Sequence, residues 1–128
     1  MDIDKFKNIN DTYGHPTGDV VLKKVMNICK ELLGKKYYIG RYGGEEFLIL
    51  LDNANSEKAL EIGETIRRRI ENLEILHDNK CIKITSSFGI FTSVRERDLE
   101  NMIKFADKAL YEAKSLGRNR VSIKMGNS

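Results

Sequence analysis

Apolar residues between positions 19 and 33 recur at intervals of three and four residues. Positions with this spacing share one face of an α-helix. They are Val21, Leu22, Val25, Ile28, Cys29, Leu32 and Leu33. Asp19 or Thr17 can cap the start of such a helix, and Gly34 supplies a stop at its end. The pattern predicts a helix over residues 19–33.

Two further helices are predicted from the same spacing. The first begins at a cap supplied by Asn55 or Ser56 and carries Ala59, Ile62, Ile66 and Ile70 along one side. The second begins after Asp98, ends near Gly117 and carries Leu99, Met102, Ile103, Ala106, Leu110 and Ala113.

Runs with high β-propensity fill much of the remaining chain. Residues 37–42 and 47–51 flank a glycine turn, which predicts a hairpin. Residues 81–91 predict a strand interrupted at Ser86-Ser87, and residues 121–123 predict a closing strand. This order of elements indicates an α+β domain with mostly antiparallel strands and helices on one or both faces of the sheet.

Length and composition are those of a soluble domain. The chain has 128 residues, 41% of them hydrophobic and 32% charged, which allows one domain with its own core over residues 1–128. The apolar run Phe47–Leu51 is too short to cross a bilayer, and the charged first residues do not resemble a signal peptide. We expect a cytoplasmic location. The domain could also be the cytoplasmic part of a larger, membrane-anchored protein. In either case we expect no membrane contact by this domain.

The charge and the cysteines exclude several classes of function. A net charge of +3, spread along the chain, does not indicate a nucleic-acid footprint, so no nucleic-acid partner is expected. Cys29 and Cys81 lack CxxC spacing and a neighbouring His pair, so we predict neither a zinc site nor a disulfide. Both cysteines are expected to be reduced and buried.

Two acidic clusters are candidates for metal chemistry. Glu45 and Glu46 follow Gly43-Gly44 at the predicted hairpin tip, and their repulsion would be relieved by a divalent cation such as magnesium. Asp2 and Asp4 lie at the end of a possible strand. If that strand lies beside the hairpin, Asp2 and Glu45 could share metal ions. The alternatives are a solvated turn at the tip and a charged chain start.

Two polar segments are candidates for nucleotide recognition. Residues 10–19 are rich in turn-forming and hydrogen-bonding residues, and an Asn amide with an Asp carboxylate could read the edge of guanine. Residues 114–120 form a basic helix end that could hold a triphosphate. Helix capping at the first segment and compensation of the helix dipole at the second are the alternatives.

Four segments together resemble the GGDEF family of diguanylate cyclases. They are Asp2–Asp11, the glycine-containing pairs Gly14-His15 and Gly18-Asp19, the signature Arg41–Phe47, and Ala106–Lys114. The resemblance covers nearly the whole chain. It implies a fold related to the palm domain of nucleotide cyclases and polymerases, with a ferredoxin-like βαββαβ core. It also implies that two copies, as a transient homodimer, each hold one GTP and join them into cyclic di-GMP with release of two pyrophosphates.

The resemblance implies a role for individual residues. Asp2, the carbonyl of Ile3 and Glu45 match the ligands of Mg²⁺, with two ions expected in each active site and Mn²⁺ as a possible substitute. Glu46 matches a residue that assists deprotonation of the attacking hydroxyl, so Glu45 and Glu46 are the expected catalytic pair. The residues matching the guanine site are Asn10 and Asp19, with His15 nearby. Those matching the triphosphate site are Phe6, Lys7, Lys114 and Arg118.

Two departures from the family pattern are expected to matter. Residues 34–37 stand where product-inhibited members carry an Arg-x-x-Asp motif, so we predict no primary allosteric product site. The chain begins at the end of the family's first strand, so that strand is expected to be truncated and an upstream regulatory domain to be missing. The isolated chain is then expected to be a monomer or weak dimer of low activity. A non-catalytic GTP-binding regulatory domain is the alternative function, and a ligand-free interaction domain is a third.

Overall fold

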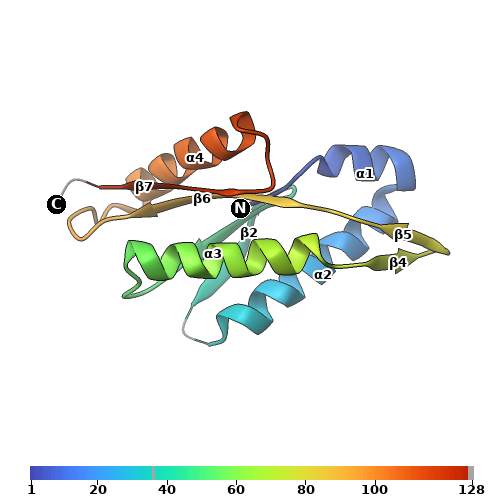
Figure 1. Ribbon diagram of the computed structural model, residues 1–128, viewed down its shortest axis with the longest axis horizontal. Coiled ribbons are helices and arrows are strands. Elements are labelled where there is room, and N and C mark those ends of the chain that lie inside the picture. Colours follow the sequence, from blue (N-terminus) through green and yellow to red (C-terminus); the bar gives the residue numbers. More distant parts are fainter. Residues whose placement is uncertain (36, 127–128) are drawn as a thin grey trace.

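A computed structural model describes residues 1–35 and 37–126, which form a five-stranded sheet with helices on both faces (Figure 1). The strands of this sheet lie in the order β2-β3-β1-β6-β7. Their bounds are Tyr38–Gly43 for β2, Glu46–Leu50 for β3, Asp2–Ile3 for β1, Ser86–Thr92 for β6 and Val121–Met125 for β7. The helices are α1 (Phe6–Tyr13), α2 (His15–Leu33), α3 (Ser56–Glu71) and α4 (Leu99–Ser115). None of the helices within the described residues is long and apolar enough to cross a membrane.

The connectivity contains the expected βαββαβ core. β1 lies in the centre and pairs antiparallel with both β3 and β6, while β2 pairs antiparallel with β3 at the edge. α2 connects β1 to the β2–β3 hairpin, and α3 leads from that hairpin towards β6. α4 and β7 extend the core, with β7 parallel to β6. The predicted α+β fold class, with mostly antiparallel strands, is confirmed.

Two adjacent residues of β6 show that α3 and α4 cover opposite faces of the sheet. A Cβ atom added to Gly89 would lie 2.2 Å from backbone atoms of Ala106 and Leu110 in α4. A Cβ added to Gly63 in α3 would lie 3.2 Å from Cδ1 of Ile90. Successive residues of a strand point to opposite faces, so α4 and α3 pack on opposite sides of β6, as Figure 1 also shows.

The main hydrophobic core lies between the sheet and helices α2 and α3. Ile3 of β1 and Phe47 of β3 are buried there, together with side chains of the helical stripes predicted from the sequence: Val21, Leu22, Val25, Ile28, Ile66 and Ile70. Full burial of one such side chain stabilises the fold by about 1.5–3 kcal/mol. The apolar spacing of the predicted helices is therefore confirmed as a core-facing pattern.

The predicted start of the first long helix was wrong. α2 begins at His15 with Gly14 as its N-cap residue, and Pro16 occupies the first turn, where its missing N–H costs nothing. Asp19 lies exposed inside the helix, and the Thr17 hydroxyl donates to the carbonyl of Tyr13 over 3.1 Å. The segment 10–19 is therefore helical on both sides of Gly14, where a turn-rich loop was expected.

The predicted cap of α3 and the predicted start of α4 after Asp98 are confirmed. The side chain of Asn55 accepts a hydrogen bond of 2.8 Å from the amide of Lys58 at the start of α3. The side chain of Asp98 accepts one of 3.0 Å from the amide of Glu100 at the start of α4. Each bond satisfies one amide of the first helical turn, which has no partner within the helix.

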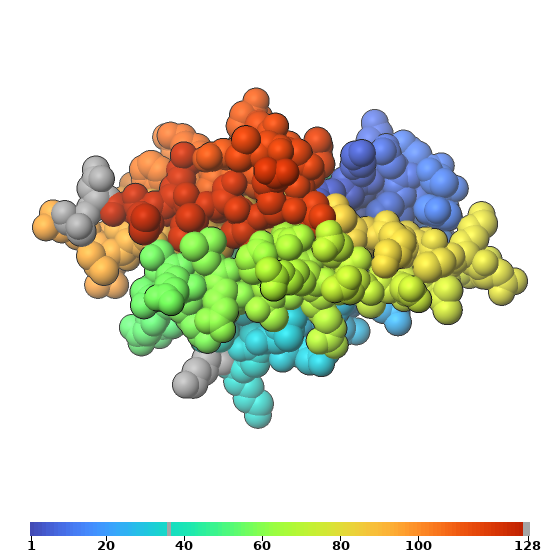
Figure 2. Space-filling model, in the orientation of Figure 1, coloured from blue at the N-terminus to red at the C-terminus, as the bar shows by residue number. Residues whose placement is uncertain are grey.

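The strand predicted over 81–91 is two separate strands. β5 (Lys80–Ile82) pairs with β4 (Ile75–His77) in a hairpin that was not predicted, and β6 begins at Ser86 without an interruption at the serines. Asp78 and Asn79 make the turn with positive φ angles, as a two-residue hairpin loop requires. Figure 2 shows this hairpin, in yellow-green, projecting at one end of the molecule.

The expectation that both cysteines are buried was half right. Cys29 is buried in α2, and burial raises the pKa of its thiol to about 12. Cys81 is exposed because it lies on the projecting β4–β5 hairpin. Lys36, which belongs to the stretch expected to lack the Arg-x-x-Asp motif, lies outside the described residues.

Candidate active site

The end of β1 lies against the tip of the β2–β3 hairpin. The amide of Phe47 donates to the carbonyl of Met1 over 2.9 Å, and the amide of Ile3 donates to the carbonyl of Glu45 over 3.3 Å. Asp2 stands opposite Glu46 in the register of the two strands. The two acidic clusters of the sequence therefore meet in space, which their spacing along the chain could not establish.

The hairpin tip is held in a tight turn. Gly44 has a positive φ angle of 29°, and its carbonyl accepts a hydrogen bond of 2.7 Å from Nε of Arg41. The strand register shifts between Arg41 and Gly43. Glu45 and Glu46 follow directly and are half-buried. The turn thus presents two adjacent carboxylates beside β1.

Asp2 is a buried carboxylate with one partner. Its side chain is 5% exposed, Oδ2 accepts a hydrogen bond from the ammonium group of Lys114, and Oδ1 has no hydrogen-bond partner among the described residues. Burial raises the pKa of Asp2, whereas the hydrogen bond and charge of Lys114 lower it and the charge of Glu45 raises it further. A buried oxygen without a partner costs free energy, and a bound cation or a hydrogen-bond donor would offset that cost.

Asp4 lies in a network that sets the position of the α4–β7 turn. Its carboxylate accepts hydrogen bonds from Thr85 Oγ1 at 2.7 Å, Ser87 Oγ at 2.6 Å and the amide of Asn119 at 3.0 Å. The side chain of Asn119 in turn accepts from Arg67 of α3 over 2.9 Å. Both the sheet and α3 therefore hold this turn in place.

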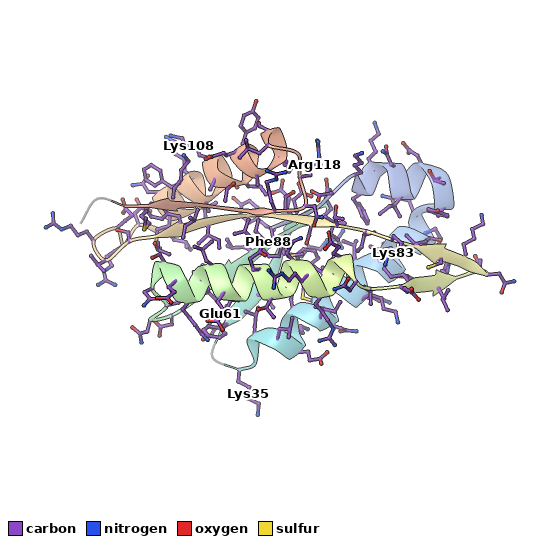
Figure 3. The ribbon with its side chains drawn as sticks, viewed as in Figure 1. Lys35, Glu61, Lys83, Phe88, Lys108 and Arg118 are labelled. Atoms are coloured by element: carbon purple, nitrogen blue, oxygen red, sulfur yellow. The ribbon has the colours of Figure 1, made fainter. Side chains whose placement is uncertain are left out.

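Lys114 and Arg118 lie at the two ends of the α4–β7 turn. Lys114 is in the last turn of α4 and reaches Asp2. Arg118 is exposed, has a φ angle of 64°, and donates its backbone amide to the carbonyl of Ala113 over 3.0 Å. Figure 3 shows Arg118 where the chain leaves α4 for β7. A cluster of positive charge thus borders the acidic site.

The side chain of Asn10, in α1, packs against Gly18 of α2, the residue before Asp19. A Cβ added to Gly18 would lie 1.9 Å from Oδ1 of Asn10, so only glycine leaves room for this side chain. Oδ1 of Asn10 is buried and lacks a hydrogen-bond partner within the described part of the chain. Asp19 and His15 are both exposed residues of α2. Asp19 follows Gly18 directly, and His15 precedes it by three positions.

The start of α1 lies directly after the acidic strand. Lys5 precedes the helix in a left-handed conformation, with φ of 55°, and Phe6 and Lys7 are the first helical residues. Phe6 is buried against the core and Lys7 is exposed. The first amides of a helix have no acceptor within the helix and favour an anion.

The whole arrangement can be compared with known families. The family description "Diguanylate cyclase, GGDEF domain" matches residues 1–120. The chain belongs to the GGDEF domain family. This GGDEF domain is similar to diguanylate cyclase A of Treponema denticola, with 45% identity over 130 residues that cover 99% of the chain and 34% of that protein. It is also similar to diguanylate cyclase DosC of Escherichia coli K12, with 42% identity over 124 residues, 96% of the chain and 27% of DosC. The domain therefore spans about a quarter to a third of the length of these curated relatives.

Solved structures of GGDEF domains have the same fold. The active GGEEF domain of a diguanylate cyclase from Vibrio cholerae superposes with a TM-score of 0.86 at 35% identity, covering 98% of this chain and 80% of that one. The GGDEF domain of DgcB from Caulobacter crescentus, solved in complex with c-di-GMP, superposes with a TM-score of 0.88 at 33% identity, covering 95% and 73% of the two chains. The expected family and fold are confirmed.

The carboxylates of the GGDEF domain would suit a Mg²⁺ ion only with further ligands from outside the chain. No group of three His, Cys, Asp or Glu side chains within residues 1–35 and 37–126 is arranged to hold a metal ion. Magnesium commonly takes one or two carboxylates and completes its shell with water and substrate phosphates. The buried Oδ1 of Asp2, beside a glutamate turn, is a donor suited to that role.

The network around Asp4 was missed in the sequence. Thr85, Ser87 and Asn119 lie far from Asp4 along the chain, and their types are common in loops and strands. The one sequence feature that could have predicted this network is Asp4 itself, the second acidic residue of Asp2-Ile3-Asp4. In a strand, residues two apart share a face, so the strand suspected in the sequence would place Asp4 on the same face as Asp2, where a buried carboxylate needs donors.

Proposed function

We propose that residues 1–128 form one diguanylate cyclase domain, which condenses two GTP molecules into cyclic di-GMP and releases two pyrophosphates. The observation that carries this proposal is the buried, unpartnered Oδ1 of Asp2 beside the glutamates of the hairpin tip. The names of the relatives, which are diguanylate cyclases, support the same reaction. A cytoplasmic location follows from GTP as the substrate.

Asp2, the carbonyl oxygen of Ile3 and Glu45 would hold two Mg²⁺ ions, which Mn²⁺ could replace. When bound, such ions activate an attacking oxygen and offset the negative charge of a phosphoryl group. Asp2 contributes a preformed ligand because the strand pairing on both sides fixes its backbone. Glu45 would contribute a ligand from the turn, where its backbone carbonyl accepts a hydrogen bond from the amide of Ile3.

Glu46 would accept the proton of the ribose 3′-hydroxyl as that oxygen attacks the α-phosphate of the second GTP. Its register opposite Asp2 supports this role, because the reacting oxygen must lie close to both carboxylates. A positioned general base of this kind contributes about 10²–10⁴-fold to the rate.

The triphosphate would lie between the start of α1 and the α4–β7 turn. The backbone amides of Phe6 and Lys7, at the first turn of α1, and the exposed side chain of Lys7 would face an anion from one side. Lys114 and Arg118 supply positive charge from the other side. Lys114 already neutralises Asp2, so it would exchange that contact for a phosphate oxygen when the nucleotide binds.

Guanine would bind at the contact between α1 and α2. Oδ1 of Asn10 would accept a hydrogen bond from a guanine N–H, and Asp19 would accept from another, with His15 nearby. One such site holds one GTP, so turnover requires a second copy to face it as a transient homodimer. In a longer chain, an upstream regulatory domain would bring two copies together.

The test is incubation of the chain at high concentration with GTP and Mg²⁺, followed by chromatography. We expect cyclic di-GMP and two pyrophosphates for each product, with a rate per chain that rises with protein concentration. Glu45→Gln should remove the activity, whereas Glu57→Gln, at an exposed position of α3, should not change it. If calorimetry shows GTP binding but no product forms, the domain is a regulatory GTP-binding domain and not a cyclase. No thermal shift with GTP and Mg²⁺ would leave only the interaction domain.

A further inference from the structure

The turn between α4 and β7 holds three successive residues in a backbone conformation that favours glycine. The φ angles are 125° at Gly117, 64° at Arg118 and 48° at Asn119. An arginine in this left-handed region is strained, and such strain persists only where the surrounding structure holds it. The exposed Arg118 supplies positive charge beside the acidic site. The contacts that hold this turn therefore set the position of that charge.

The side chain of Asn119 is bound by α3 at both of its polar atoms. Its Oδ1 accepts a hydrogen bond of 2.9 Å from Nη1 of Arg67, and its Nδ2 donates to the carboxylate of Glu71. Its backbone amide donates to the carboxylate of Asp4 over 3.0 Å. Asn119 is therefore held through its side chain by a helix and through its backbone by the residue that follows the central strand.

Two further contacts hold the backbone of Arg118. Its amide donates to the carbonyl of Ala113 over 3.0 Å, and its carbonyl accepts a hydrogen bond of 3.1 Å from Nε of Arg120. Both contacts come from residues close to Arg118 in the sequence, within the turn and its two flanking elements. Asn119 is the residue that connects this turn to α3.

Arg67 is itself held in one orientation. Its side chain is 13% exposed, and its Nε and Nη2 donate to the two carboxylate oxygens of Glu64 at 2.8 and 3.1 Å. Because a guanidinium group is planar, these two bonds also fix the direction of Nη1, which donates to Asn119. Arg67 thus presents a rigid donor to the turn from α3, on the face of the sheet opposite to α4.

We propose that Arg67 is a positioning residue for GTP binding, because through Asn119 it holds Arg118 in the conformation that binds the triphosphate. This inference rests on the proposed function, which places Arg118 against the phosphates. Without the bond from Arg67, the turn can relax towards the negative φ angles that arginine and asparagine ordinarily adopt. The charge of Arg118 would then no longer be held at the triphosphate, and the affinity for GTP would fall.

A double-mutant cycle with Arg67→Met and Arg118→Ala tests this coupling. Calorimetry measures binding of the α,β-methylene analogue of GTP with Mg²⁺. Arg118→Ala should weaken binding about tenfold, because it removes a charged hydrogen-bond donor, and Arg67→Met should weaken it at least fivefold. The double variant should bind as Arg118→Ala alone does, because Arg67 then has no charge to position. Arg68→Met removes the same charge from the neighbouring side chain, which is 70% exposed, and should leave binding unchanged.

A second variant leaves α3 intact. Asn119→Gly tolerates the positive φ angle and removes only the side-chain contacts. It should weaken binding at least fivefold and should likewise add nothing to Arg118→Ala, so this variant decides the matter if Arg67→Met does not fold.

Amide exchange without nucleotide tests whether Arg67 holds the turn. In Arg67→Met, the exchange rate of the Asn119 amide should rise by a factor at least ten times larger than that of Val25. Val25 is fully buried in α2, and its amide reports unfolding of the whole domain.

Several results would overturn the proposal and leave the cyclase reaction in place. They are unchanged binding after Arg67→Met and Asn119→Gly, unchanged binding after Arg118→Ala, and additive effects in the cycle. Equal acceleration of exchange at Asn119 and Val25 would also overturn it, because Arg67 would then contribute only to general stability. If the unchanged chain does not bind the GTP analogue, the proposed function fails, and this inference fails with it.

Discussion

The carboxylate of Asp4 accepts a hydrogen bond of 3.0 Å from the backbone amide of Asn119, 115 positions away in the chain. This bond joins the end of β1 to the turn between α4 and β7, which carries Arg118. Lys114, at the other end of the turn, contacts Asp2 of the same strand. The acidic strand and the basic turn are therefore fixed to each other at two points.

Asp4→Ala is expected to lower the free energy of unfolding by about 3 kcal/mol. The substitution leaves the hydroxyls of Thr85 and Ser87 and the amide of Asn119 without their shared acceptor, and each hydrogen bond to a charged group contributes about 1.5–3 kcal/mol. Urea denaturation measures the change. Asp11→Ala, at an exposed position of α1, should change stability by less than about 0.5 kcal/mol. Equal stabilities of the two variants would show that the network contributes nothing.

Gly18→Ala is expected to weaken GTP binding about tenfold by displacing the side chain of Asn10. The new Cβ would lie 1.9 Å from Oδ1 of Asn10, so that side chain must leave its position. Loss of one hydrogen bond to guanine corresponds to about 1.4 kcal/mol, which is tenfold in affinity. Calorimetry with GTP and ATP measures the effect, which should be present for GTP alone and should be reproduced by Asn10→Ala.

Asn8→Ala is the matched control for that experiment, because Asn8 is an exposed residue of the same helix. Its affinity for GTP should equal that of the unchanged chain. If Gly18→Ala and Asn10→Ala bind GTP as tightly as Asn8→Ala does, guanine does not bind at the contact of α1 and α2.

The ion pair of Glu64 and Arg67 is expected to make stability depend on pH in the acid range. Arg67 donates to both carboxylate oxygens of Glu64, at 2.8 and 3.1 Å, and this hydrogen bonding and the positive charge of Arg67 lower the pKa of Glu64 below its ordinary value of 4.5. A carboxyl group whose pKa is lower in the folded state stabilises the fold above pH 4.5, and this stabilisation is lost as the pH falls through the folded pKa. Glu64→Gln should therefore show a smaller loss of stability between pH 5 and about pH 3.

Chemical denaturation at a series of pH values compares the two proteins. Glu61→Gln is the control, because Glu61 lies on the same helix and its side chain is 68% exposed. Its profile should follow that of the unchanged chain. Parallel profiles for all three proteins would mean that the Glu64–Arg67 pair does not contribute to the acid dependence.

The elements with regular apolar spacing could be predicted from the sequence, because a helix of this kind must bury one stripe. This holds for the residues from Val21 to Leu33, and for the capped starts at Asn55 and Asp98. The start of α2 could not be predicted, because Pro16 and Gly14 suit both a turn and the first turn of a helix. The β4–β5 hairpin was missed because its three-residue strands are too short to show an alternating pattern.

The candidate site could be predicted only as separate clusters. The types of Asp2 and Glu45 indicate metal chemistry, but their proximity depends on the pairing of β1 with β3, which is 40 residues or more distant in sequence. The Lys114 contact and the Asn119 contact likewise depend on the parallel return of β7 beside β6. Long-range strand order is not encoded in any local pattern, so the family resemblance carried this part of the prediction.

The central claim is that Asp2 and Glu45 together hold divalent cations against the phosphates of a nucleotide. Mn²⁺ is titrated into a solution of the chain and a non-hydrolysable GTP analogue. The electron paramagnetic resonance signal of the Mn²⁺ that stays free then measures how much is bound. We expect two Mn²⁺ ions per chain, and at least tenfold weaker binding after Asp2→Ala or Glu45→Ala but not after Glu57→Ala. Unchanged Mn²⁺ affinity in the Asp2→Ala and Glu45→Ala variants would contradict the account.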